Sequence, residues 1–297
     1  MENIKLCNDC PRRCNVNREA GFGYCKSTNT LRVARAALHM WEEPCISGDD
    51  GSGAIFFSGC NMQCVFCQNK DIATGEVGKD ISINRLAEIM LELKDKNANN
   101  INLVTPSHYV NQIVDAIDIA RKEGLSIPIV YNTSSYEKVE TLKKLDGYVD
   151  VYLPDCKYYD DELAVKYSKA PGYYGIAIKA IEEMLNQTGK PVFDDNNMIQ
   201  KGVIVRHMVL PGHTKDSCNV IKGLYEKFGN SIYLSMMSQY TPLEHVKEYA
   251  KINRRITTRE YDKVLNYALD IGITNGFFQD MDVAKESFIP EFNLEGV

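Results

Sequence analysis

The sequence predicts an α/β protein in which a parallel sheet curls toward a barrel, preceded by a small cysteine-rich lobe. After Ala54, short continuous apolar runs alternate about six times with amphipathic segments, and such runs are typical of parallel strands covered on both faces. The preceding residues are rich in Cys, Asn and Arg without a sustained period. A chain of 297 residues can bury one large core. We therefore expect a lobe over residues 1–50 and a barrel over residues 51–297.

The expected strands are the six apolar runs, at residues 54–58, 101–105, 127–131, 149–153, 202–208 and 231–237. Amphipathic helices are expected between and after them, over residues 83–93, 110–120, 220–228 and 261–269. Ser82 can cap the first of these helices, and glycines follow the other three, as is common at helix ends. Repeated strand–helix units imply right-handed crossovers, with ligands bound at the carboxyl ends of the strands.

Composition excludes several classes of function. The net charge of −6 and the scattered Lys and Arg residues give no electrostatic footprint for nucleic acid. The first residues lack the apolar stretch of a signal peptide, and no segment has the length of a membrane span. We expect a cytoplasmic protein without a membrane partner.

Seven of the ten cysteines fall in two clusters, Cys7, Cys10, Cys14 and Cys25, then Cys60, Cys64 and Cys67. In a reducing compartment, clustered cysteines more often bind metal or perform redox chemistry than form disulfides. The isolated Cys45, Cys156 and Cys218 are expected to be small buried hydrophobic residues.

The segment GCNMQCVFCQN (59–69) directly follows the first expected strand. Its C-x3-C-x2-C spacing can bind three irons of a 4Fe–4S cluster, which normally takes four cysteine ligands. The fourth iron then keeps an open position, as catalytic metal sites do, and an amino-carboxylate such as S-adenosylmethionine (SAM) suits it. The alternative, a zinc knuckle or unrelated buried cysteines, explains neither the three ligands nor the position after the first strand.

The sequence resembles the radical SAM superfamily, and within it the subgroup similar to pyruvate formate-lyase activating enzyme. The resemblance runs from Leu6 to Gly272 and is carried by LCNDCPRRCNVNR, GCNMQCVFCQN, VTPSHYV, YNTSSYE, LPDCKYYD, VRHMVLPG and SMMSQYTP. It implies a partial (β/α)6 TIM-like barrel and an anaerobic oxidoreductase that cleaves SAM reductively to a 5′-deoxyadenosyl radical. It also implies reduced flavodoxin or ferredoxin as the electron donor.

Candidate SAM ligands follow the strands. Phe66 can pack on adenine or against the barrel. Many superfamily members carry Gly-Gly-Glu after the second strand to engage the SAM amino group; here Thr105, Ser107 or His108 takes its place, although Ser107 also suits a helix cap. Asn132, Thr133 and Ser134 suit the ribose hydroxyls or, alternatively, helix capping. Gln239 ends the sixth strand at the same mouth.

Charged residues follow the later strands. Asp155 and Lys157 resemble the Asp-x-Lys of glycyl-radical-enzyme activases and are the expected catalytic pair; a solvated ion pair is the alternative. Arg206 lies within an apolar strand and needs an anionic partner, either the SAM carboxylate or a neighbouring Asp such as Asp155.

The four cysteines of the lobe follow a C-x2-C-x3-C-x10-C pattern. Four thiolates close a site completely, which suits structural Zn²⁺ or an auxiliary Fe–S cluster. Their spacing does not decide between the two metals.

Two enzymatic functions agree with these motifs. The protein either activates a glycyl-radical enzyme by abstracting hydrogen from a backbone glycine, or acts as a radical SAM enzyme on a small molecule, peptide or nucleic acid. A non-catalytic electron carrier is disfavoured, because the main cluster has only three cysteine ligands.

Overall fold

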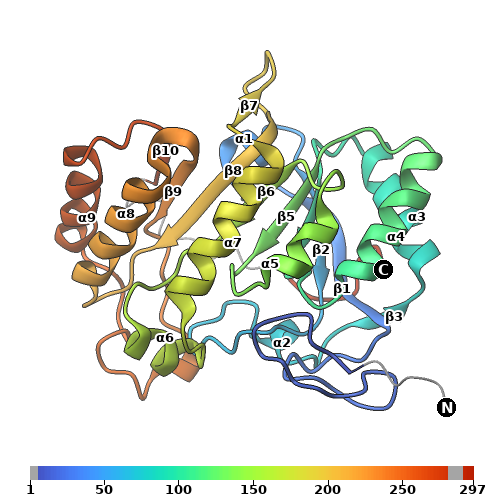
Figure 1. Cartoon of the computed structure of the whole chain (residues 1–297), viewed down its shortest axis with the longest axis horizontal. Coiled ribbons are helices and arrows are strands. Elements are labelled where there is room, and N and C mark those ends of the chain that lie inside the picture. Colours follow the sequence, from blue (N-terminus) through green and yellow to red (C-terminus); the bar gives the residue numbers. More distant parts are fainter. Residues whose placement is uncertain (1–5, 280–289) are drawn as a thin grey trace.

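A computed structural model describes residues 6–279 and 290–297. Its centre is an open, mostly parallel sheet (Figure 1). The parallel strands are β2 (Ser52–Phe57), β4 (Ile101–Val104), β5 (Ile129–Thr133), β6 (Val151–Pro154), β8 (Ile199–Met208), β9 (Tyr233–Met237) and β10 (Gly276–Phe278). All six predicted strands are present. The expected α/β fold, a partial TIM-like barrel, is confirmed.

Three strands add antiparallel edges to this sheet. They are β1 (Leu31–His39), which pairs with β2, β3 (Lys79–Ile81), which pairs with β1, and β7 (Val192–Phe193), which pairs with β8. Residues 1–50 were predicted to form a lobe, yet β1 is a full member of the main sheet. The division at residue 50 stays a prediction; residues 6–30 before β1 and residues 40–50 after it lie outside the sheet.

Residues near the carboxyl end of the chain pack on β1. The Leu294 amide donates to the Ala34 carbonyl (3.2 Å), and the Ala36 amide donates to the Glu295 carbonyl (2.8 Å). Arg35 also forms an ion pair with Glu295 at 2.7 Å. The first strand of the sheet is therefore held in part by residues about 260 positions later in the sequence.

Helices cover the sheet, and all four predicted helices are present. The helices are α1 (Pro44–Ser47), α2 (Lys70–Ala73), α3 (Ile83–Asp95), α4 (Val110–Lys122), α5 (Val139–Leu142), α6 (Asp161–Ser168), α7 (Tyr173–Thr188), α8 (Thr214–Phe228) and α9 (Thr258–Asp270), with 3₁₀ turns η1 (Lys143–Leu145), η2 (Gly229–Ser231) and η3 (Glu244–Val246). Ser82 caps α3 as predicted, accepting a hydrogen bond from the Arg85 amide. None of the described helices has the length and apolar character needed to cross a membrane.

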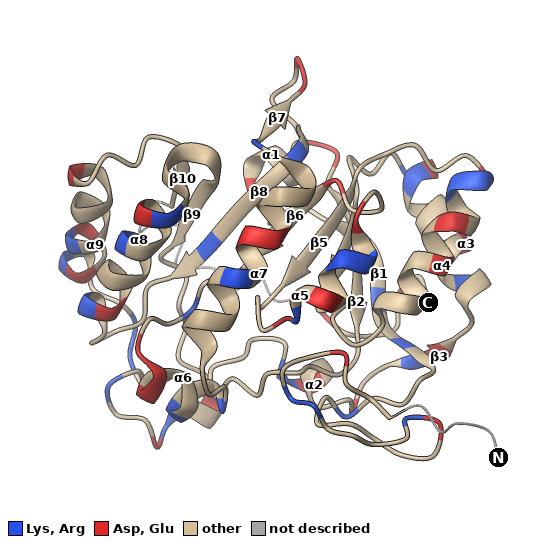
Figure 2. Ribbon diagram, in the orientation of Figure 1, with Lys and Arg blue, Asp and Glu red and all other residues tan. Residues whose placement is uncertain are grey.

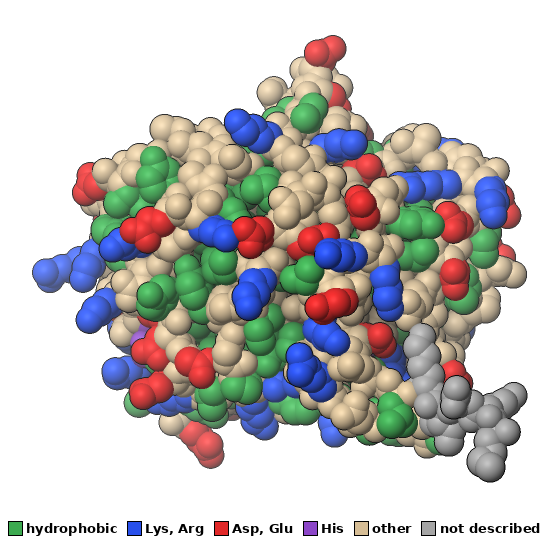
Figure 3. Space-filling view, in the orientation of Figure 1, with side chains coloured by type: hydrophobic (Ala, Val, Ile, Leu, Met, Phe, Trp, Pro, Cys, Tyr) green, Lys and Arg blue, Asp and Glu red, His purple; other side chains and the backbone are tan. Residues whose placement is uncertain are grey.

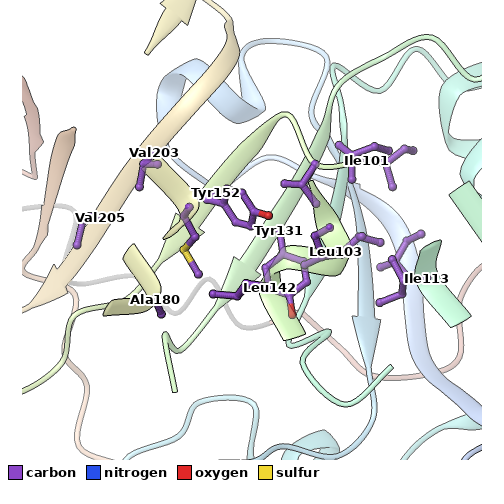
Figure 4. Packing of buried hydrophobic residues seen from close by; sticks show 14 of the residues in the cluster. Ile101, Leu103, Ile113, Tyr131, Leu142, Tyr152, Ala180, Val203 and Val205 are labelled. Carbon is purple, nitrogen blue, oxygen red and sulfur yellow. The ribbon is translucent and has the colours of Figure 1, made fainter. Parts of the chain in front are cut away.

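The main core lies between the sheet and these helices. Ile101, Leu103 and Tyr131 from neighbouring strands meet Ile113 of α4 and Leu142 of α5 (Figure 4). All five are fully or almost fully buried. This packing fixes the strands, so the loops at their carboxyl ends have a rigid base.

Those carboxyl ends point downward in Figure 1, toward α2, α6 and the loops that precede β1. On the visible face, acidic and basic residues are interspersed over the helices (Figure 2), and the space-filling view shows side chains of both signs mixed with apolar ones (Figure 3). Charges of both signs therefore mix over the described part of that face.

Candidate active site

A cavity of about 240 Å³ opens at the carboxyl ends of the parallel strands. It brings together most of the predicted site residues, namely Cys60, Cys64, Cys67, Phe66, Thr105, Asn132, Thr133, Ser134, Asp155, Lys157, Arg206 and Gln239. Segments scattered over about 180 positions of sequence meet here because parallel strands all end at the same edge.

The loop after β2 carries the first cysteine cluster into this cavity. Hydrogen bonds reach two of its sulfur atoms: the Met62 amide donates to Cys60 Sγ at 3.4 Å, and Ser168 Oγ donates to Cys64 Sγ at 3.0 Å. The Tyr158 hydroxyl lies 2.7 Å from Ser168 Oγ and fixes that contact. Such hydrogen bonds to cysteine sulfur tune the potential of an Fe–S cluster.

The three thiols fit a cationic cluster. Burial and the neighbouring thiols raise the pKa of Cys60, and burial together with Cys64 raises that of Cys67 to about 12. Three thiolates in one buried place repel one another, and iron relieves this repulsion while it replaces the protons. Among the described residues, no three ligand side chains stand at single-ion spacing. The assignment of these cysteines therefore rests on the motif and the shared cavity.

Beside the cysteines, a chain of ion pairs spans β6 and β8. Asp155 accepts from Lys157 Nζ at 2.6 Å and from Arg206 Nε at 2.9 Å. Burial alone would raise the pKa of Asp155, but Arg206 and Lys157 outweigh it and hold the pKa below its usual range. Lys157 also interacts with Cys64, where its charge opposes the rise in thiol pKa that burial causes. Asp155 is thus a carboxylate that orients two cations.

Arg206 is held by three side chains. Besides Asp155, its Nη1 donates to Glu42 Oε2 at 3.0 Å and its Nη2 to Asn132 Oδ1 at 2.7 Å. Asn132 in turn donates to Glu42 at 3.2 Å. This is the neighbouring-carboxylate arrangement given above as the alternative to the SAM carboxylate. A contact between Arg206 and SAM stays a prediction.

Ser107 and His108 lie outside the cavity, which corrects their expected place. Ser107 donates to the buried carboxylate of Glu137, and His108 Nε2 lies 2.9 Å from the Ser58 carbonyl. Burial lowers the pKa of His108 to about 3, so the ring is neutral. Both side chains are used to hold the loops together. Of the three candidates after the second predicted strand, only Thr105 lines the cavity.

Thr105 and Phe66 differ in how they reach the cavity. Thr105 has a φ of 59°, a left-handed conformation that is rare for a β-branched residue and is often kept at functional sites. Phe66 is 5% exposed, and its ring packs against Tyr158 and Tyr240 with centroids 6.5 and 6.0 Å apart. Phe66 therefore packs against the barrel, which was the second role predicted for it, and forms part of the cavity wall.

The cavity lining also includes residues that were not singled out from the sequence, among them His39, Trp41, Glu42, Met208 and Met237. The first three follow or end β1, which borders the cavity only because it pairs with β2. No motif marks them. The apolar positions within residues 31–39 could have predicted a strand there, and its end would have pointed to these residues.

Glu43 makes stability depend on pH. It is buried, and its Oε2 finds no hydrogen-bond partner within residues 6–279 and 290–297. Burial raises the pKa of Glu43 from 4.5 to about 7, against the opposing charge of Arg206. The folded protein therefore binds this proton more tightly than the unfolded chain, so ionisation destabilises the fold as pH rises from 4.5 to 7.

We expect Glu43→Gln to match the wild type below pH 4.5 and to exceed it in unfolding free energy above pH 7, because glutamine stays neutral. Urea unfolding at a series of pH values measures this difference. A difference that is constant across the series would contradict the assignment.

The sequence matches the radical SAM superfamily over residues 54–222. An uncharacterized protein of Methanocaldococcus jannaschii is 32% identical over 276 residues, covering 89% of this chain and 75% of that protein. The pyruvate formate-lyase-activating enzyme of Clostridium pasteurianum is 24% identical over 232 residues, covering 72% of this chain and 86% of that enzyme.

Among solved structures, Streptococcus suis SuiB bound to S-adenosylmethionine superposes with a TM-score of 0.51 at 15% identity. The match covers 76% of this chain and 50% of SuiB, so the chain spans half the length of that protein. The resemblance to pyruvate formate-lyase activating enzymes is confirmed, and the expected 4Fe–4S cluster and SAM are the cofactors of the matched family. The chain belongs to the radical SAM superfamily.

Proposed function

We propose that this protein activates a glycyl-radical enzyme by abstracting a hydrogen atom from a backbone glycine of that partner. The observation that carries the proposal is the Asp155–Lys157 pair, which matches the Asp-x-Lys of activases and shares a cavity with the three cluster cysteines. The distant similarity to an enzyme that activates pyruvate formate-lyase adds support.

Cys60, Cys64 and Cys67 would hold the cluster, and Thr105, Thr133 and Ser134 would contact SAM beside it. When bound, these cofactors supply a 5′-deoxyadenosyl radical, with the electron coming from reduced flavodoxin or ferredoxin.

The chain's own residues would receive the glycine loop of the partner. Asp155 holds Lys157 at 2.6 Å, and an ammonium group has three N–H donors, so Lys157 can also donate to a peptide carbonyl of an entering loop. The Tyr173 hydroxyl lies 2.8 Å from the carbonyl oxygens of both Ser134 and Asp155, to which it can donate its one proton, and it accepts from the Lys157 amide. This tyrosine fixes the ends of β5 and β6 relative to each other, as near-contact hydrogen transfer requires.

Ordering a loop of another protein in this cavity is costly, so we expect modest affinity between the free proteins. Incubating the reconstituted protein with SAM, reductant and a candidate glycyl-radical enzyme should produce the doublet electron paramagnetic resonance (EPR) signal of a glycyl radical. One SAM should be consumed per radical formed.

Two controls sharpen this test. Replacing the acceptor glycine of the partner with alanine should remove the signal, and Lys157→Met should reduce radical formation while the iron content is kept. Catalytic SAM consumption with a small molecule, peptide or nucleic acid, and no glycyl signal with any partner, would favour the other radical SAM function.

A further inference from the structure

We propose that Cys7, Cys10, Cys14 and Cys25 bind a metal centre, and that this centre holds the cluster loop (residues 58–69) in position. The four cysteines lie outside the cavity, in the loops before β1. We call residues 7–27 the cysteine lobe. The proposal rests on how the four thiols converge and on how the cysteine lobe touches the cluster loop.

The first half of the cysteine lobe folds back on itself. The Cys7 amide donates to the Val16 carbonyl at 2.8 Å, and the Asn15 amide donates to the Cys7 carbonyl at 3.0 Å. Within this hairpin the Arg13 amide donates to the Cys10 carbonyl at 3.1 Å, and both Arg13 and Asn15 have positive φ. Such a tight return keeps the first three cysteines of the lobe on one short loop.

The second half brings Cys25 to the same place. A Cβ atom added to Gly23 would lie 3.3 Å from Cys25 Sγ and 3.8 Å from Cys14 Sγ, so both sulfur atoms flank one glycine. The Tyr24 amide donates to Cys14 Sγ at 3.2 Å.

Cys14 and Cys25 flank one glycine, and Cys7 and Cys10 share the hairpin with Cys14. Together these four thiols form the donor set of a closed site for Zn²⁺ or an Fe–S cluster. Among the described residues, no three ligand side chains lie close enough together to bind one metal ion, and this holds for the lobe cysteines and for those of the cluster loop. The structure therefore does not distinguish Zn²⁺ from an Fe–S cluster, and metal analysis is needed to identify the metal.

The cysteine lobe and the cluster loop touch through their backbones. The amide of Cys60 donates to the carbonyl of Cys25 at 3.1 Å. A Cβ atom on Gly59, whose φ is 91°, would lie 2.5 Å from the Cys25 carbonyl oxygen and 2.1 Å from Ser27 Oγ. Ser27 Oγ in turn lies 3.3 Å from the carbonyl oxygens of both Cys25 and Ser58, to which it can donate its one proton. Only glycine allows this approach.

Arg12 makes a second connection. Its Nε donates to the Asn61 carbonyl at 2.7 Å, and its guanidinium lies over the Tyr24 ring, 3.9 Å from the centroid. One residue of the lobe, Cys25, would thus ligate the lobe metal and accept the hydrogen bond of Cys60. A metal that fixes Cys25 therefore also fixes the first ligand of the main cluster.

The first experiment asks whether the cysteine lobe holds metal by itself. Anaerobically purified Cys60→Ala/Cys64→Ala/Cys67→Ala protein lacks the main site but keeps the lobe intact. We expect metal analysis to find about one zinc, or about four irons, per chain. Adding Cys10→Ser should remove that metal, whereas adding Cys218→Ser should not. A triple variant without bound zinc or iron would overturn the proposal.

The second experiment tests the connection to the cluster loop. In the otherwise wild-type protein, Cys14→Ser should change the EPR spectrum of the reduced main cluster and speed its loss of iron to a chelator several-fold. Cys218→Ser serves as the matched control. If Cys14→Ser does not fold, Ser27→Ala can replace it, because this variant keeps all four thiols. It should retain the lobe metal and change the EPR spectrum and the rate of iron loss in the same direction, but by less. An unchanged spectrum and unchanged iron loss would overturn the connection. Neither experiment involves a partner protein, so both can be interpreted even if the activase proposal is wrong.

Discussion

Alanine at Cys60, Cys64 or Cys67 is expected to abolish reductive cleavage of SAM. Each thiol supplies one ligand to a cluster that has three protein ligands, and losing one opens a second iron. Anaerobic reconstitution followed by iron analysis and quantification of methionine and 5′-deoxyadenosine measures the effect.

The matched control is Cys156→Ala, because Cys156 is fully buried and lies beside the same cavity without lining it. This variant should keep its iron and its cleavage activity. Cleavage retained in all three cluster variants would contradict the central assignment.

Replacing Arg206 with methionine is expected to lower the free energy of unfolding by about 3–5 kcal/mol, because removing one partner of a buried ion pair leaves the other charge uncompensated. Glu42, whose side chain is 9% exposed, would lose its cation, and Asp155, at 15%, would keep only Lys157. Chemical denaturation of wild type and variant under reducing conditions measures the loss.

A surface ion pair provides the control. Lys222 and Glu226 lie 3.7 Å apart on α8 with more than half of each side chain exposed, so Lys222→Ala should change stability by about 0.5 kcal/mol or less. In the Arg206→Met background, Glu42→Gln should recover part of the loss. Equal effects of Arg206→Met and Lys222→Ala would show that the buried network contributes little.

Much of the fold could be predicted because its signals are local. The parallel strands appear as continuous apolar runs, and helices such as α3 carry a cap and an apolar face within one short segment. By contrast, Arg32 and Arg35 interrupt the apolar residues of β1, and its place depends on pairing with β2. Local pattern does not encode that pairing.

The candidate site follows the same division. Cysteine spacing marked the cluster loop, and strand ends marked Asp155 and Lys157. The partners of Arg206 come from positions 42, 132 and 155, and nothing near Arg206 in the sequence indicates all three. Ser107 and His108 were predicted to bind SAM because they follow a strand. A side chain at a strand end can also point into the packed loops, and both of these side chains do so.

The attachment of residues 294 and 295 to β1 has a consequence for biosynthesis. Contacts between segments about 260 positions apart raise the contact order of the chain, and non-local pairing slows folding. Because translation runs from the amino terminus, β1 leaves the ribosome about 260 residues before this neighbour. Until then the nascent sheet carries an incompletely covered segment, the kind of intermediate that aggregates and that chaperones protect.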